Sequence, residues 1–172
     1  GYYLKKHCHS AISLASSSKY KVDNHTWITF RLGEFYLNYA EAVYKYLDSP
    51  YSTSGDLPMS AVSAVNKTRV RAGMPVFPAG MTNDAFWTKY KNERMVELAF
   101  EGHRFWDVRR WKEAATYFKS IQEMKLTKNA DGTITYIRNT VSRQWDDKMY
   151  LFPIPQTELM KNKNLTQNPG WN

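Results

Sequence analysis

The chain has 172 residues, of which 42% are hydrophobic and 23% are charged, a composition that excludes disorder and allows a domain with a hydrophobic core. Its 24 Lys and Arg residues against 16 Asp and Glu residues give a net charge of +8, but the cations are scattered, which argues against nucleic acid as a partner. A single cysteine excludes an intrachain disulfide, and no segment approaches the roughly 20 apolar residues of a membrane-spanning helix.

Residues 1–28 predict an irregular or extended lead-in, since they include a serine run and a polar stretch. His7 and His9 flank Cys8, but on a strand the two imidazoles and the thiol would point to opposite faces. We therefore expect no metal site and no cofactor. The chain does not begin with Met and shows no signal peptide, so we expect it to be one domain over residues 1–172 of a longer protein.

Two helices are predicted in the first half of the chain. Residues 31–47 carry Phe35, Tyr39, Val43 and Tyr46 at intervals of three and four, which predicts a helix that buries this apolar stripe. A second helix is predicted from Pro58 to Val70, followed by an Ala-Gly-Met-Pro stop over residues 72–75. Together they predict an antiparallel hairpin of tetratricopeptide-like size.

The second half predicts further helices and one small sheet. Thr82 or Asn83 suits the cap of a third helix, Gly102 predicts a break, and residues 104–118 predict one more helix. Residues 124–138 predict a β-hairpin around turn residues 129–132, and a short helix is expected at 156–160. The predicted fold class is mainly α, with tetratricopeptide-like helix-turn-helix hairpins, a small β-hairpin and irregular loops.

A row of carboxylates runs along the third predicted helix. Glu93, Glu97 and Glu101 recur every four residues on one face, where like charges repel one another unless cations lie beside them. Arginine suits that position because its planar fork holds a carboxylate through two hydrogen bonds. We therefore predict a partly buried structural ion network made of Glu93, Arg94, Glu97, Glu101, Arg104, Asp107, Arg109 and Arg110.

The alternative for the same row is a carboxylate pair for glycoside hydrolysis. That chemistry needs a general acid with a raised pKa, whereas nearby arginines would lower the pKa of each carboxyl. We favour the structural interpretation and expect no catalytic residues.

Aromatic side chains in loops are the candidate ligand contacts, because the apolar face of a sugar ring stacks on them. Packing residues have the same chemistry, so both interpretations stay open at each position. The candidate glycan-binding residues are Trp27, Tyr51, Phe77 and Trp145.

Four segments in order carry a resemblance to the SusD/RagB family. Residues 31–42, RLGEFYLNYAEA, resemble the family's R-L-A-E-x-Y-L-x-Y-A-E-A helix, with Gly33 at the usual alanine. Residues 66–73 resemble its N-x-x-R-x-R-A-G helix end, residues 93–111 resemble its most recognisable stretch, and residues 153–170 resemble its C-terminal ending. The matched segments belong to the scaffold and do not include the family's sugar-binding residues.

The resemblance implies the C-terminal part of a lipoprotein on the outer face of the outer membrane of Bacteroidetes-type bacteria. Such a protein would bind oligosaccharide or polysaccharide without cleaving it and deliver it to a TonB-dependent, SusC-like outer-membrane transporter. The protein would contact the membrane only through a lipid on an N-terminal segment absent from this chain. Cys8 does not match the family's lipid-bearing cysteine. The alternative is an interaction scaffold of the transporter complex that binds no glycan.

Overall fold

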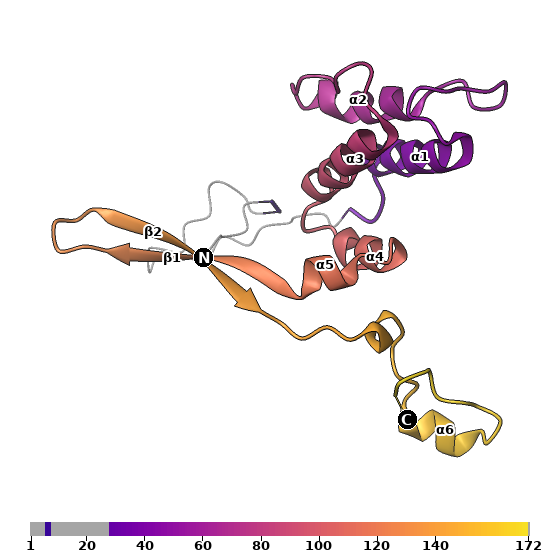
Figure 1. Ribbon diagram of the computed structural model, residues 1–172, viewed down its shortest axis with the longest axis vertical. Helices are drawn as coiled ribbons and strands as arrows, with labels where there is room; N and C mark the ends of the chain where they lie inside the picture. The colour runs from indigo at the N-terminus through magenta and orange to yellow at the C-terminus, as the bar shows by residue number, and fades with distance from the viewer. Residues whose placement is uncertain (1–5, 8–27, 172) are drawn as a thin grey trace. The chain divides into compact units, whose positions relative to one another are not determined.

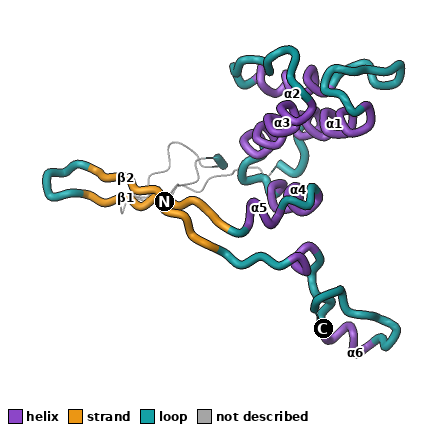
Figure 2. Tube along the Cα trace, in the orientation of Figure 1, coloured by secondary structure: helices purple, strands orange, loops and turns teal. Residues whose placement is uncertain are grey.

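The computed structural model describes residues 6–7 and 28–171, and these form a mainly helical chain with one small sheet (Figures 1 and 2). Within this part, no helix has both the length and the apolar content needed to cross a bilayer. The predicted fold class is confirmed, while the predicted lead-in, apart from residues 6, 7 and 28, lies outside the described residues. The elements are α1 Leu32–Leu47, α2 Ala61–Arg71, α3 Asn83–Glu97, α4 His103–Arg110, α5 Ala114–Phe118, β1 Ser120–Lys128, β2 Ile134–Ser142, the 3-10 helix η1 Asp147–Tyr150 and α6 Gln156–Lys161.

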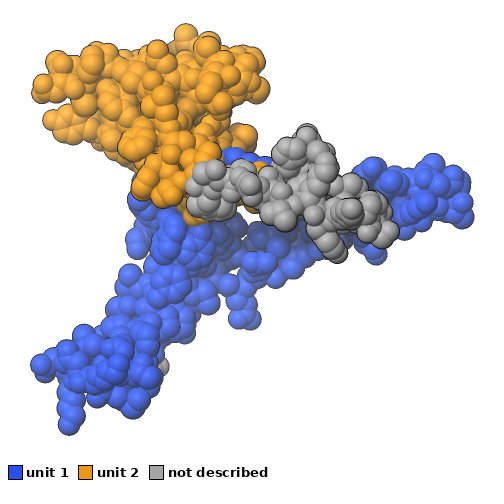
Figure 3. Space-filling view, turned by 180° about the vertical axis from the view of Figure 1, so that it is seen from behind, with its two compact units in different colours: residues 1–6, 105–172 blue, residues 7–104 orange. Residues whose placement is uncertain are grey.

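The chain divides into two compact units, coloured separately in Figure 3. One unit consists of residues 7–104 and contains α1, α2 and α3. The other consists of residues 1–6 and 105–172 and contains most of α4 together with the later elements. The expectation of a single domain over residues 1–172 stays a prediction.

Helices α1 and α2 form the predicted antiparallel pair. At one end, the Val62 amide donates to the carbonyl of Pro50, just past α1. At the other end, Arg31 before α1 and Arg71 at the end of α2 both contact Glu97 of α3. The third helix runs antiparallel to α1, since the Tyr44 hydroxyl near the end of α1 donates to the carbonyl of Asn83, where α3 begins.

The core of residues 7–104 lies between these three helices. Fully buried side chains include Leu37 and Val43 from α1, Val65 from α2, and Phe86 and Tyr90 from α3. Two aromatic side chains of this core stack on each other, since the ring centroids of Phe86 and Tyr90 lie 6.1 Å apart.

The predicted buried face of α1 is only partly right: Val43 is buried and Tyr39 is half-buried, but the other two residues of the stripe are exposed. Phe35 is 58% exposed and Tyr46 is 78% exposed, whereas Glu34 and Glu41 are buried with the core residues. The two carboxylates tolerate burial because they have polar neighbours, and Glu41 accepts a hydrogen bond from the Tyr90 hydroxyl at 3.0 Å. Polar residues on the inner face therefore partly concealed its helical period, and the spacing of Phe35 and Tyr46 indicated a face rotated toward solvent.

Local capping residues set the ends of α2 and α3. The hydroxyl of Ser60 accepts from the amide of Ser63, so α2 begins three residues later than the predicted Pro58. The hydroxyl of Thr82 accepts from the amide of Ala85, as one of the two predicted caps of α3. The predicted stop after α2 is confirmed, with Gly73 in the left-handed region at φ 70°.

The predicted helix over residues 104–118 is wrong, because the backbone breaks it into α4 and α5. Lys112 adopts φ 59°, a left-handed conformation that an α-helix does not accommodate. The amide of Glu113 instead donates to the carbonyl of Val108 at 2.9 Å. The hairpin that follows is longer than predicted, since β1 and β2 pair from Ser120 with Ser142 to Lys128 with Ile134.

Candidate functional site

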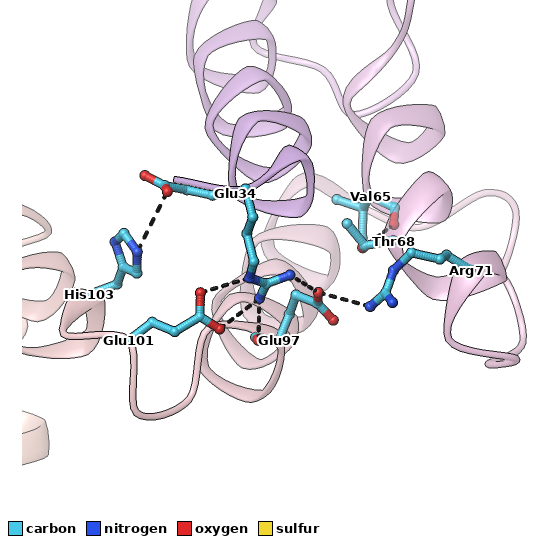
Figure 4. Close-up of polar contacts among 8 residues, drawn as sticks. Glu34, Val65, Thr68, Arg71, Glu97, Glu101 and His103 are labelled. Atoms are coloured by element: carbon cyan, nitrogen blue, oxygen red, sulfur yellow. Dashed lines mark hydrogen bonds and ion pairs between the residues drawn. The ribbon is translucent and has the colours of Figure 1, made fainter. Parts of the chain in front are cut away.

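Two carboxylates of the row, Glu97 on α3 and Glu101 just after it, hold the side chain of Arg31. Its Nη1 donates to Glu97 Oε1 at 2.5 Å, and its Nε donates to Glu101 Oε2 at 2.7 Å (Figure 4). Its Nη2 reaches Glu101 Oε1 and the backbone carbonyl of Glu97. The hydrogen bond to Glu101 raises the pKa of Arg31, and the bond to Glu97 adds to this, although partial burial acts in the opposite direction. One guanidinium thus joins the start of α1 to the end of α3.

Two arginines of α2 complete the contacts of this row. Arg69 forms an ion pair with Glu93, and Arg71 approaches Glu97 at 3.2 Å. All three carboxylates of the predicted row therefore hold guanidinium groups supplied by other elements, from before α1 and from α2. Such pairing suits bracing between helices, since each carboxylate already has a cationic hydrogen-bond donor.

The remaining predicted members of the ion network lie in different surroundings. Arg94 is buried, and its Nη1 donates to Asn38 Oδ1 at 2.7 Å. Arg104 is half-buried at the start of α4. Within α4, Arg110 pairs with the buried Asp107 at 3.0 Å. Sequence spacing thus identified the carboxylates of the row but not Arg31, Arg69 and Arg71, which contact them from other elements.

Arg109 differs most from its predicted role as an ion-pair partner. Its guanidinium lies 3.6 Å from the ring centroid of Phe105 and within 6 Å of the rings of Phe118, Trp145 and Phe152. Burial lowers the pKa of this arginine. Cation–π contact with an aromatic cluster is therefore its main interaction among the described residues.

Of the four glycan-binding candidates, one cannot be placed, one is buried and one is exposed in a loop contact. Trp27 lies outside the described residues. Phe77 is only 7% exposed and packs edge-on against Phe86, so its predicted exposure is wrong and it belongs to the core. Tyr51 is exposed, but its hydroxyl is engaged with the carbonyl of Pro78 and the amide of Met81, which ties two loops together.

Trp145 is the candidate that lines a cavity. The cavity has a volume of about 640 Å³, within the usual range of small-molecule sites. It lies where the base of the hairpin meets the segment leading to η1. Its lining includes Lys119, Arg143, Gln144, Trp145, Asp146 and Lys148.

Several contacts fix the orientation of the Trp145 ring. It meets Tyr150 edge-on with centroids 5.0 Å apart and lies 5.6 Å from the Phe118 ring. Its Nε1 donates to Asp147 Oδ1 at 3.3 Å. A second cavity of about 760 Å³ shares Asp146 and Lys148 with the first. The Trp145 side chain is half-buried, so part of the indole is exposed beside a polar cavity and can contact a ligand.

The polar residues of this cavity were missed from sequence. Arg143, Gln144, Asp146 and Lys148 lie within three positions of Trp145, so a search around each candidate aromatic would have found them. Lys119 is distant in sequence, but the Arg143 amide donates to its carbonyl at 2.6 Å, which continues the pairing of the strands.

No group of three or more His, Cys, Asp or Glu side chains suited to a metal ion occurs among residues 6–7 and 28–171. Cys8 and His9, at which the sequence predicted no metal site, lie outside those residues.

Comparisons with known proteins agree on one family. The sequence matches the family model described as the SusD family over residues 1–171. The chain is similar to the crystal structure of a SusD-like protein from Bacteroides fragilis NCTC 9343, with 32% identity and a TM-score of 0.70. That similarity covers 84% of this chain and 26% of the other, so the chain spans about a quarter of that protein. A search of curated proteins finds no match. The chain therefore belongs to the SusD family.

Proposed function

We propose that this chain is the C-terminal part of a non-catalytic lipoprotein that binds oligosaccharide or polysaccharide at the outer face of the outer membrane. The protein would deliver the glycan to a TonB-dependent, SusC-like transporter. Membership of the SusD family supports the general role in nutrient uptake. The observation that carries the binding role is the oriented Trp145 ring on the wall of a polar cavity.

The chemistry of that cavity suits a sugar. A pyranose ring has an apolar face that stacks on an indole, and its hydroxyls then need hydrogen-bond donors and acceptors. Gln144 supplies both from one amide, while Asp146 supplies acceptors and Lys148 supplies donors. Trp145 is thus surrounded by the groups that a bound saccharide requires.

Hydrolysis by the glutamate row fits the structure poorly. Glu97 and Glu101 share the Arg31 guanidinium, and Glu93 holds Arg69. Neither of the two cavities at Asp146 is lined by a glutamate. Each of the three carboxylates is already engaged with a cationic hydrogen-bond donor from another element. These contacts support a bracing role for the row.

The proposal is tested by measuring glycan binding to the Trp145→Leu variant. Leucine keeps an apolar side chain but removes the ring face, so affinity for any glycan bound by the wild type should fall at least about tenfold. An array of bacterial, plant and host glycans identifies ligands, and calorimetry on the whole chain measures affinity. Trp106→Leu is the matched control, because Trp106 is exposed but lines neither cavity.

Two results would contradict the binding site at Trp145. One is equal loss of affinity in both tryptophan variants, and the other is full affinity in Trp145→Leu. Capture of a β-barrel transporter by a protein without affinity for any glycan would support the scaffold alternative instead. Circular dichroism on each variant separates loss of binding from loss of folding.

A further inference from the structure

We infer that the cavity beside Trp145 selects glycans that carry an anionic group, a carboxylate or a sulfate, close to the stacked sugar ring. This inference rests on the proposed function and narrows its substrate class. It starts from the side chains that line the cavity, where three cations, Lys119, Arg143 and Lys148, accompany one carboxylate, Asp146.

The single carboxylate has one of its oxygens in a hydrogen bond to the local backbone. Asp146 Oδ1 accepts a hydrogen bond from the amide of Lys148 at 3.1 Å and thereby caps η1. The ammonium group of Lys148 also contacts the protein, since its Nζ lies 4.9 Å from the centroid of the Trp171 ring. The lining therefore keeps positive charge in excess, because one carboxylate balances only one of its three cations.

Lys119 and Arg143 are held next to each other at the base of the hairpin. The Arg143 amide donates to the Lys119 carbonyl at 2.6 Å, so the two residues are neighbours across the strands. Both are exposed, and neither side chain forms an ion pair with a carboxylate anywhere in the described part of the chain. Arg143 is also separated from Trp145 by a single residue.

This arrangement places a planar fork and an ammonium beside an aromatic ring. An arginine fork binds a carboxylate or sulfate through two parallel hydrogen bonds, which strengthens binding and fixes the orientation of the anion. A neutral sugar would stack on Trp145 but offer the two cations only hydroxyl acceptors, without an opposite charge. A uronate or sulfated sugar satisfies the ring and the cations together.

Calorimetry at about 0.15 M salt tests the inference with two matched pairs of probes, because salt at that level screens distant surface charge. One pair is an oligogalacturonate and its methyl ester, which differ only in the carboxylate. The other is sulfated dextran and dextran of equal length, which differ only in the sulfate. The combined Lys119→Gln and Arg143→Gln variant is compared with a Lys125→Gln and Arg138→Gln control, which removes the same charge from exposed hairpin positions outside both cavities.

The expected result is tighter binding of the anionic member in at least one pair. That preference should fall at least about tenfold in the Lys119 and Arg143 variant and by no more than about twofold in the control. Preference for the carboxylate pair or the sulfate pair identifies the source of the anion. Circular dichroism confirms that both variants keep the helical fold.

Equal loss in the variant and the control would overturn the inference, because it would show attraction to the overall charge of +8. The same calorimetry is run with a DNA oligomer. Tighter binding of that oligomer than of the oligogalacturonate and the sulfated dextran would overturn the inference as well. Equal wild-type affinity for both members of each pair, with Trp145→Leu still weakening both, would overturn the charge selectivity and leave the proposed function standing. Absence of affinity for any saccharide would overturn both.

Discussion

Arg31 contacts two carboxylates that lie 66 and 70 residues later in the sequence. We expect Arg31→Lys to lower the free energy of unfolding by about 2 kcal/mol. An ammonium group has no planar fork, so it cannot keep the charged hydrogen bonds that the guanidinium donates to both carboxylates. The side chain is 23% exposed, so solvent screening keeps the loss below that of a fully buried pair. Urea denaturation followed by circular dichroism measures it.

Arg71→Lys is the matched control for this substitution. Its guanidinium is 67% exposed and approaches Glu97 from the surface, where ion pairs contribute about 0–1 kcal/mol. The control should therefore change stability by less than about 0.5 kcal/mol. Equal effects of the two substitutions would show that Arg31 does not brace the helices.

Asp131 in the hairpin turn provides a prediction about pKa. Its Oδ1 accepts from the Thr133 hydroxyl at 2.7 Å and from the Thr133 amide at 2.9 Å, and these bonds lower its pKa, the hydroxyl most strongly. Thr133→Val should therefore raise the pKa of Asp131 toward the ordinary value of 3.8. Carbon-13 NMR titration of the carboxyl measures the change.

The sign of the pH dependence follows from the same bonds. Because the folded-state pKa is below the unfolded value, the contribution of Asp131 to the turn is fully present above the unfolded pKa and is lost as pH falls through the folded pKa. Thr135→Val is the control, since the Thr135 hydroxyl accepts from Asn129 and does not contact Asp131. A similar pKa rise in that control would contradict the assignment to Thr133.

Among the elements, α3 depends on the hydroxyl at its start. Thr82→Ala removes the acceptor of the Ala85 amide and should destabilise the protein by about 1 kcal/mol. Thr88→Ala, on the exposed side of the same helix, should be neutral or slightly stabilising because alanine is the better helix former. Chemical denaturation midpoints give both values, and indistinguishable midpoints would exclude a capping role for Thr82.

The elements also show what sequence could predict. Thr82 and Gly73 mark helix ends through local backbone chemistry, so they could be identified without knowing the fold. The inner face of α1 could not, because Glu34 and Glu41 become acceptable inside only once partners from other elements surround them. The break at Lys112 had no glycine or proline to indicate it.

In the candidate site, too, some features follow from local sequence and others only from tertiary packing. Trp145 was proposed because an aromatic residue in a predicted loop is visible in sequence, and its ligand role stays a prediction. Phe77 has the same local appearance but is buried by tertiary packing. Arg31 was missed as the partner of Glu97 and Glu101 because the pairing depends on how α1 and α3 pack.

At the scale of the whole molecule, buried apolar residues are distributed unevenly. Of the described residues, those with buried apolar side chains lie almost entirely within 7–104, while Val108 and Ala114 are the exceptions in the other unit. Most side chains of β1 and β2 are exposed. Local opening therefore has a lower free energy in the hairpin than in α1, α2 and α3.

Hydrogen exchange of the whole chain should reveal this difference. We expect backbone amides in the interior turns of α1 and α3 to exchange at least about tenfold more slowly than the paired amides of β1 and β2, because exchange from the helices requires opening of the core. Mass spectrometry of peptides spanning each element measures the rates. Equal protection in the hairpin and the helices would indicate one cooperative unit over the chain.

Gly33 has a practical consequence for anyone who engineers this protein. A β-carbon at this position would lie 2.7 Å from Arg31 Nη1 and 3.1 Å from Glu97 Oε1. A design that replaces each residue by the one usual in the family would change Gly33 to alanine. From helix propensity alone, this change should raise the free energy of unfolding by up to about 1 kcal/mol. The added methyl group would push the guanidinium away from its carboxylates, so the expected gain would be offset. This glycine is best left unchanged when such a library is designed.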